Sequence, residues 1–241
     1  MNTVNLLKKL SLASLCATVF WTPVANAATI YDPSAEFSPT SNPSSPWSYG
    51  YSLTQGGSMI LHQENFNING VDTWRTNIAG SSTPLVGNNP TSNPVSAITW
   101  VLDPGTISLH PGPNNERALL RFTAPTTGIY QILGSFSGSD IYGTTTDVHL
   151  LTNGVSIFDG LVNGFSVSST QLFDNTVKLN NGDFLDFAVG YGYNNNYYND
   201  TTQLSARIIA VTTSTPEPAT IISLLGLGTL GMTVLKRKKT T

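Results

Sequence analysis

The sequence predicts an all-β protein, with one antiparallel β-sandwich as its folded body. Only 10% of the residues are charged, and Asn, Ser, Thr and Gly take their place, a composition of turns and polar strand faces rather than helices. Short apolar runs bounded by turn signals recur at spacings of about 8 to 12 residues. No segment shows the periodicity of an amphipathic helix.

The chain divides into a processed start, one domain and a processed end. About 185 residues lie between the two ends, which is enough for one domain with a real core. The expected parts are a signal peptide (1–27), an irregular lead-in (28–48), the sandwich (49–211), a linker (212–218), a transmembrane helix (219–235) and a basic cytoplasmic tail (236–241).

The expected strands follow the apolar runs of the body. They are 58–62, 66–68, 98–102, 107–110, 116–122, 129–136, 148–152, 155–158, 176–179, 184–189 and 204–211. The segment 80–94, with three prolines, is expected to be a polar loop. Asp103-Pro104-Gly105 predicts a turn that joins 98–102 and 107–110 as a hairpin, and Asn153-Gly154 and Asn180 to Asp183 are further turn signals.

One connection resembles a known fold. From Arg121 to Tyr130 the chain has a phenylalanine followed by small residues. A turn from Pro125 to Gly128 comes next, and the segment ends with Gly128-Ile129-Tyr130. This resembles the strand-turn-strand of jelly-roll domains of the tumour-necrosis-factor and C1q type. The resemblance covers ten residues and implies a jelly-roll-like arrangement of two sheets.

The N-terminus has the three regions of a secretory signal peptide. Lys8 and Lys9 precede an apolar stretch, and Ala25-Asn26-Ala27 predicts cleavage after Ala27. The chain's one cysteine, Cys16, lies within this stretch, so the mature protein holds no disulfide.

The expected mature body is acidic. All 14 acidic residues of the chain lie between 28 and 218, where five basic residues accompany them: Arg75, Arg117, Arg121, Lys178 and Arg207. Such a surface disfavours nucleic acid and anionic lipid as partners.

The C-terminal sequence consists of three consecutive parts. Pro216-Glu217-Pro218 precedes the uncharged apolar run 219–235, whose helix would cover roughly 26 Å, just enough to span a membrane. A basic cluster then acts as a cytoplasmic stop-transfer signal: Lys236, Arg237, Lys238 and Lys239. A plain C-terminal anchor is the simpler interpretation.

The order of these three parts resembles the PEP-CTERM sorting signal. The resemblance implies an exosortase as partner, held in the inner membrane with the substrate before processing, and release or transfer to the cell surface or extracellular matrix. It also implies a bacterial host that makes exopolysaccharide.

Two aromatic groups are candidates for contacts with polysaccharide. Trp47, Tyr49 and Tyr51 alternate along one strand face, where they could equally be core. The stretch 191–200 consists almost entirely of Tyr, Asn, Gly and Asp, and its candidates are Tyr191, Tyr193, Tyr197 and Tyr198. The alternative for this stretch is a solvated loop.

No catalytic or metal-binding motif is present. His62, His110 and His149 lack zinc-ligand spacing, and His149 alternates with apolar neighbours as an outward-facing strand residue would. Seven aspartates in the second half could cap turns, supply oxygen ligands to calcium or form a glycosidase pair: Asp140, Asp147, Asp159, Asp174, Asp183, Asp186 and Asp200. We expect no resident cofactor or metal.

Asp186 lies within an apolar strand, so a buried carboxylate there needs a partner, for which Arg207 is the candidate. The sequence as a whole predicts a non-enzymatic, Sec-exported surface or matrix protein with a structural or adhesive role in an exopolysaccharide matrix. A carbohydrate-binding module is the first alternative, and a secreted glycoside hydrolase is the second.

Overall fold

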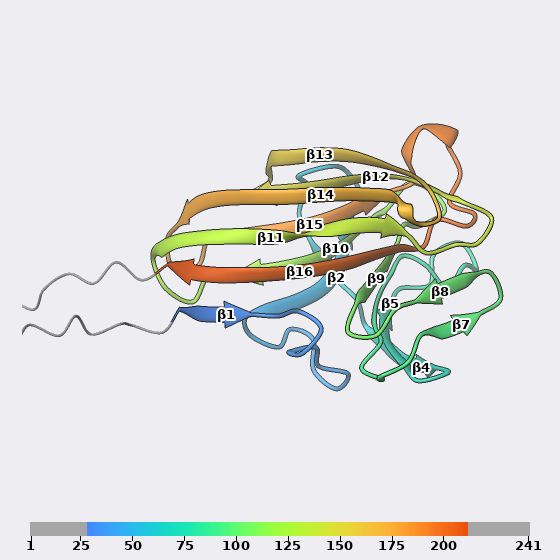
Figure 1. The fold of residues 1–241 in the computed structure, drawn as a ribbon, viewed down its shortest axis with the longest axis horizontal. Coiled ribbons are helices and arrows are strands. Elements are labelled where there is room, and N and C mark those ends of the chain that lie inside the picture. The colour runs from blue at the N-terminus through green and yellow to red at the C-terminus, as the bar shows by residue number, and fades with distance from the viewer. Residues whose placement is uncertain (1–27, 212–241) are drawn as a thin grey trace, which may run out of the picture.

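The computed structural model describes residues 28–211, which form two large antiparallel sheets packed face to face (Figure 1). The predicted all-β class is confirmed. The only helical segment within these residues is one 3-10 turn, η1 (Gly192–Asn194). The expected signal peptide and transmembrane helix lie outside the described residues.

The first sheet has eight strands, in the order β14-β11-β16-β9-β6-β5-β4, with β1 paired to β16. Their bounds are β1 (Thr29–Tyr31), β4 (Glu64–Ile68), β5 (Val71–Arg75), β6 (Leu85–Asn88), β9 (Ile107–His110), β11 (Gly128–Gly138), β14 (Ser166–Leu179) and β16 (Thr202–Val211).

The second sheet has six strands, in the order β13-β12-β15-β10-β2-β3. Their bounds are β2 (Trp47–Ser52), β3 (Ile60–Leu61), β10 (Arg117–Thr123), β12 (Thr144–Thr152), β13 (Val155–Gly164) and β15 (Phe184–Gly190). A separate two-stranded ribbon is formed by β7 (Val95–Ala97) and β8 (Trp100–Leu102).

The strand order is that of a jelly roll. Of its eight strands, β1, β16, β11 and β14 are neighbours in one sheet and β10, β15, β12 and β13 in the other. Consecutive strands of this set lie in opposite sheets, except for the β12–β13 hairpin. The segment 121–130 crosses from β10 in one sheet to β11 in the other, as the resemblance implied. All the strands from β2 to β9 are an insertion between the first two strands of this pattern.

The core lies between the sheets, where alternate residues meet. Ala118, Leu120 and Phe122 of β10 are fully buried, as the alternation predicted. The Phe122 ring contacts the rings of Trp47 at 5.3 Å and Tyr130 at 5.7 Å, so residues of both sheets form one aromatic cluster.

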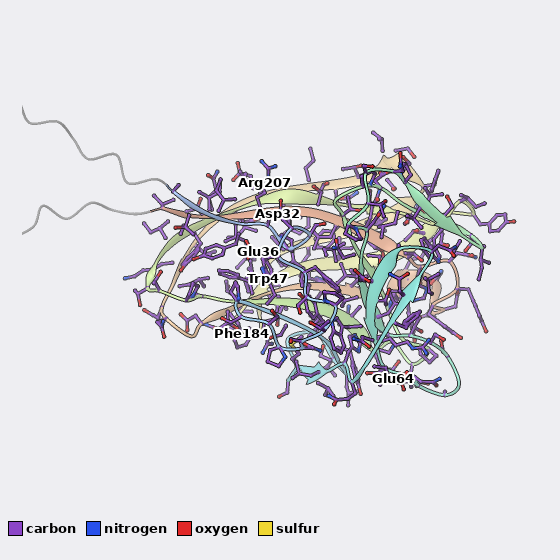
Figure 2. The ribbon with its side chains drawn as sticks, turned by 90° about the horizontal axis from the view of Figure 1, so that it is seen from below. Asp32, Glu36, Trp47, Glu64, Phe184 and Arg207 are labelled. Atoms are coloured by element: carbon purple, nitrogen blue, oxygen red, sulfur yellow. The ribbon has the colours of Figure 1, made fainter. Side chains whose placement is uncertain are left out.

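The lead-in 28–48, expected to be irregular, contains a strand and is held by side chains. Strand β1 pairs with the last strand, Thr29 opposite Ala210. The indole N–H of Trp47 donates to Glu36 at 2.8 Å, and Figure 2 shows these two labelled side chains close together. Glu36 therefore compensates a polar group that the core would otherwise leave unpaired.

Several strand predictions are wrong, and no strand was predicted at β7. Strand β6 lies in the expected loop 80–94, strand β5 was not predicted, and β14 begins ten residues before the predicted 176–179. Both short strands lie in a part of the sheet whose two faces are covered, and the early half of β14 is an exposed edge rich in Ser and Thr. Neither environment gives a clean apolar alternation.

The predicted hairpin of 98–102 and 107–110 is also wrong. The turn at Asp103-Pro104-Gly105 is present, but β8 pairs with β7, while β9 pairs with β6 and β16. A turn motif in the sequence indicates where the chain changes direction. It does not identify which strands pair, and the pairing partners of β9 come from distant parts of the chain. The Asn153-Gly154 prediction is confirmed, with both residues at positive φ between β12 and β13.

The sandwich has two distinct ends. Thr29 and Val211 lie at one end, where β1 and β16 pair (Figure 1). Strand β16 starts at the other end, beside β9 and the 191–200 loop, and its ten residues cover roughly 30 Å. Features near Thr202 are therefore distant from the point where the chain leaves the body toward its C-terminus.

Candidate functional site

A cavity lies at the end of the sandwich where β16 begins. Its volume is about 670 Å³. Its floor is the outer face of β5, β6 and β9, and its walls are the β7–β8 ribbon and the end of the 191–200 loop.

Alternation along three strands creates this floor. Trp74, Val86 and Leu109 point into the main core, while their neighbours Arg75, Leu85 and His110 line the cavity. One face of this part of the sheet therefore packs on the core, and the other face lines the cavity. A Cβ built on Gly87 would lie 2.6 Å from the Ser108 hydroxyl, so glycine at this position leaves room for the side chain of Ser108, a cavity residue.

Four aromatic side chains border the cavity: Phe66, Trp100, Tyr197 and Tyr198. The last two rings are 4.7 Å apart, and Tyr198 is 67% exposed. The rings of Tyr197 and His110 also form a T-shaped pair, with centroids 6.2 Å apart. The lining also includes Thr83 and Ser108, whose side chains carry hydroxyl groups. Flat apolar rings with dispersed hydroxyls suit a ligand that has apolar faces and many polar groups.

The ribbon that forms one wall carries a strained residue at its tip. Ile98 has φ 53° and is 99% exposed. A β-branched side chain disfavours this left-handed region, so the backbone here is held by its surroundings. The holding contacts run from Thr99 to Asp140: the hydroxyl donates to Oδ1 at 2.6 Å, and Trp100 pairs with Asp140 as an isolated bridge.

Asp140 connects both walls of the cavity. Its Oδ2 accepts from the Thr201 N–H at 2.7 Å, while Oδ1 is taken by Thr99. The side chain is 1% exposed. Asp140 is the one carboxylate among the residues that line this cavity, and both its oxygens are already engaged.

Asp200 fixes the wall formed by the tyrosine-rich loop. Its Oδ1 accepts from the Thr145 N–H at 3.1 Å, but Oδ2 is buried without a hydrogen-bond partner. Burial raises the pKa of this carboxyl to about 7, and nearby Asp140 and Asp147 also raise it. The loop is thus held by a carboxyl that is partly protonated near neutral pH.

The first group of predicted glycan contacts is not a surface. Trp47 and Tyr49 are fully buried in the core, so the prediction that they contact a glycan is wrong. Burial raises the pKa of Tyr49 to about 12. Tyr51 is half-buried and stacks on His62 at 5.7 Å. The other interpretation of these alternating aromatic residues was that they belong to the core. The burial of Trp47 and Tyr49 in β2 agrees with it.

The second group is divided. Tyr197 and Tyr198 line the cavity, whereas Tyr191 and Tyr193 do not. Sequence reasoning missed the partners Phe66 and Trp100. Each comes from an insertion strand whose position beside the loop depends on long-range pairing, and no local pattern indicates it.

The predicted partner of Asp186 is wrong. Arg121, directly opposite on the neighbouring strand, donates to both carboxylate oxygens, at 2.7 and 2.8 Å. Arg207 is in the other sheet, with its Nε 3.9 Å from an Asp32 oxygen. Figure 2 shows Arg207 beside Asp32, and Phe184, near Asp186 in the chain, on the opposite side of the molecule. Burial raises the pKa of Asp186 although Arg121 favours its charged form.

His149 lies on the outer face of its sheet, as predicted, within a charged network. Its Nε2 is 2.8 Å from Asp147, and its Nδ1 is 2.5 Å from Asp159. Burial alone would raise the pKa of Asp147, but His149, Arg117 and the Gly192 N–H together hold it well below its usual range. Both nitrogens of the ring face carboxylates, so the network fixes the orientation of this side chain.

Residues 28–211 contain no group of three or more His, Cys, Asp or Glu placed to hold a metal ion. Within the same range, no helix is long and apolar enough to cross a membrane. The predicted cleavage site, sorting triplet, apolar run and basic cluster lie outside the described residues.

Residues 214–238 match the PEP-CTERM protein-sorting motif. This confirms the predicted sorting signal, which includes Pro216, Glu217 and Pro218. The motif marks an exported protein, anchored through its C-terminus and processed by an exosortase at the cell surface. No curated protein sequence matches the chain.

Solved structures similar to the body include three different proteins. Rabbit GITRL is 14% identical, with 39% of this chain and 73% of that chain covered and a TM-score of 0.26. CBM51 from Clostridium perfringens GH95, in complex with methyl-galactose, is 12% identical, with 47% and 79% covered and a TM-score of 0.32. A family 35 carbohydrate binding module from Clostridium thermocellum is 12% identical, with 58% and 87% covered and a TM-score of 0.26.

Proposed function

We propose that this exported, exosortase-processed surface protein is an adhesive component of an exopolysaccharide matrix, and that it binds saccharide in the cavity. Export follows the Sec route, with cleavage after Ala27. The protein binds its ligand without turnover.

The observation that carries the proposal is the cavity's position and lining. Tyr197, Tyr198 and Trp100 offer faces on which a pyranose ring can pack, and the lining also includes residues that carry hydroxyl groups. The cavity includes Thr201, beside the start of β16, whereas Val211 ends the same ten-residue strand and is followed by the sorting motif. A body attached through its C-terminus would present the Thr201 end outward, toward the matrix.

The cavity's charges support binding rather than hydrolysis. A glycosidase of the usual kind requires two carboxyl groups flanking the bond to be cleaved. The carboxylate that lines this cavity, Asp140, is engaged through both oxygens with the Thr99 hydroxyl and the Thr201 N–H. It is therefore a structural connection between the two walls.

Affinity electrophoresis of the mature protein from its native host tests this function. Gels that contain the host's own exopolysaccharide should retard the protein relative to gels without it. Equal mobility in both gels would overturn the proposal, and sugar release during incubation would overturn the claim of binding without turnover.

Intact mass of the same preparation tests sorting at both ends. We expect a first residue at Ala28 and a C-terminus near Pro216 to Pro218, with the C-terminal cleavage lost in a strain that lacks the exosortase. A tail intact through Thr241 in both strains would mean that the segment 219–235 is a plain anchor.

A further inference from the structure

We infer that the saccharide bound in this cavity is neutral, and that His110 selects it as a hydrogen-bond acceptor for a sugar hydroxyl. This inference rests on the proposed function. It concerns which class of glycan the site takes.

Charge in the cavity argues against acidic sugars. Arg75 is the one cation among the residues that line the cavity. Its Nε donates to Glu64 at 3.2 Å, and its guanidinium lies over the Phe66 ring, 4.1 Å from the centroid. A uronate would have to replace Glu64 as the partner of this cation.

A buried carboxylate adds to the same effect. Asp140 is a cavity residue that has no basic side chain among its hydrogen-bond partners. An anionic ligand in this space would face like charge from the protein, at low dielectric, where screening by salt is weak. Neutral sugars avoid this penalty.

His110 supplies the specific acceptor. Its Nδ1 lies 2.8 Å from the carbonyl oxygen of Pro111, a group that can only accept, so Nδ1 carries the proton. In the neutral ring Nε2 is then an acceptor, and no protein group within residues 28–211 donates to it. Burial lowers the pKa of His110, which favours this neutral ring.

The placement of His110 suits recognition of a ring hydroxyl. It ends β9 on the cavity floor, and its ring forms the T-shaped pair with Tyr197. A pyranose that packs on the tyrosine wall would bring its equatorial hydroxyls toward this floor. A hydroxyl can donate to Nε2 and accept from neighbouring hydroxyls at once, whereas a carboxylate can only accept.

Affinity electrophoresis with a panel of defined polysaccharides tests the inference. The neutral probes are dextran, galactan and galactomannan, and the acidic probes are polygalacturonate and alginate, all at about 0.15 M salt, where nonspecific attraction is screened. At least one neutral probe should bind about tenfold or more tightly than either acidic probe. Preferential retardation by an acidic probe would overturn the neutral assignment and leave the proposed function standing. No retardation by any probe or by the host's exopolysaccharide would overturn both.

Variants of His110 test its role. His110→Phe keeps a ring beside Tyr197 but removes the acceptor, and we expect it to weaken binding of the retarding probe about five- to tenfold. His110→Gln retains an acceptor oxygen and should recover part of this loss. Circular dichroism melts verify that both variants fold. Binding by His110→Phe equal to the wild type would overturn the assignment of this residue, and so would a loss in both variants alike.

Discussion

Asp200 joins the tyrosine-rich loop to β12 through one oxygen, which accepts from the Thr145 N–H at 3.1 Å, and buries the other without a partner. The uncharged carboxyl tolerates this arrangement better than the carboxylate does, which is why its pKa rises to about 7. The same residue ends the segment that carries Tyr197 and Tyr198. The pH at which the fold is most stable and the shape of the cavity wall therefore depend on one group.

We predict that Asp200 makes the protein less stable as pH rises from about 4 to about 7. In this window the unfolded chain has already released the proton, while the folded chain still holds it, so unfolding becomes more favourable as pH increases. The melting temperature should fall across the window by about 5 °C, and Asp200→Asn should remove this decrease. Melting curves at intervals of half a pH unit measure it.

Asp183→Asn is the matched control, because the Asn180 N–H holds the pKa of Asp183 below its usual value. Its effect has the opposite sign: the wild-type carboxylate stabilises above about pH 4 and this contribution is lost as pH falls. Equal pH profiles for wild type and Asp200→Asn would contradict the assignment.

The pair of Arg121 and Asp186 gives a second prediction. Asp186→Asn removes one partner of a two-bond ion pair whose carboxylate side chain is 2% exposed, so we expect a loss of about 3 kcal/mol in the free energy of unfolding. Replacing both residues, as Arg121→Met with Asp186→Leu, should recover much of this loss because no unpaired charge remains. Urea denaturation measures all three proteins.

Arg207→Met provides the comparison for that pair. Its side chain is 68% exposed and lies 3.9 Å from Asp32, so the change should stay within about 0.5 kcal/mol. A larger loss in Arg207→Met than in Asp186→Asn would mean that the ion pair between the neighbouring strands is not the important one.

The fold could be predicted where the chain interacts with its own neighbours. Strand β10 alternates cleanly, so Ala118 and Phe122 were expected in the core, and Asn153-Gly154 was expected to turn back β12. Asp186 shows the limit of this reasoning. The sequence indicated that it needs a partner, but only the register of β10 and β15 places Arg121 opposite it.

Only half of the aromatic residues of the candidate site could be predicted from the sequence. The composition of 191–200 identified Tyr197 and Tyr198, because Tyr and Asn in one run are unusual at any position. Trp100 and Phe66 carry no such signal, since they come from an insertion whose strands pair across long stretches of chain. Trp47 and Tyr49 were equally good candidates by sequence, and burial alone separates them from the site.

The tyrosine wall gives a third prediction. Tyr197→Ala or Tyr198→Ala should weaken binding of whichever polysaccharide retards the wild type by roughly tenfold, equivalent to about 1.4 kcal/mol for a lost aromatic contact. Tyr193→Ala is the control, because Tyr193 belongs to the same loop and is 59% exposed but does not line the cavity. Affinity electrophoresis of the three variants checks this. Equal losses in all three would place the ligand elsewhere on the loop.

The strained tip of the β7–β8 ribbon gives a fourth prediction. Ile98→Asn should raise the free energy of unfolding by about 1 kcal/mol, or 2–4 °C in melting temperature, because Asn tolerates the left-handed backbone that Ile98 adopts and the lost side chain is 99% exposed. Asn69→Ile is the reverse control: Asn69 has φ 53° in the exposed turn between β4 and β5, and the change should cost a similar amount.

If Ile98 is strained for the sake of the cavity rim it borders, the more stable Ile98→Asn protein should also bind polysaccharide more weakly. Stabilisation with unchanged binding would mean that the rim residue has no part in holding the ligand, and destabilisation would mean that the surroundings do not impose the strained backbone.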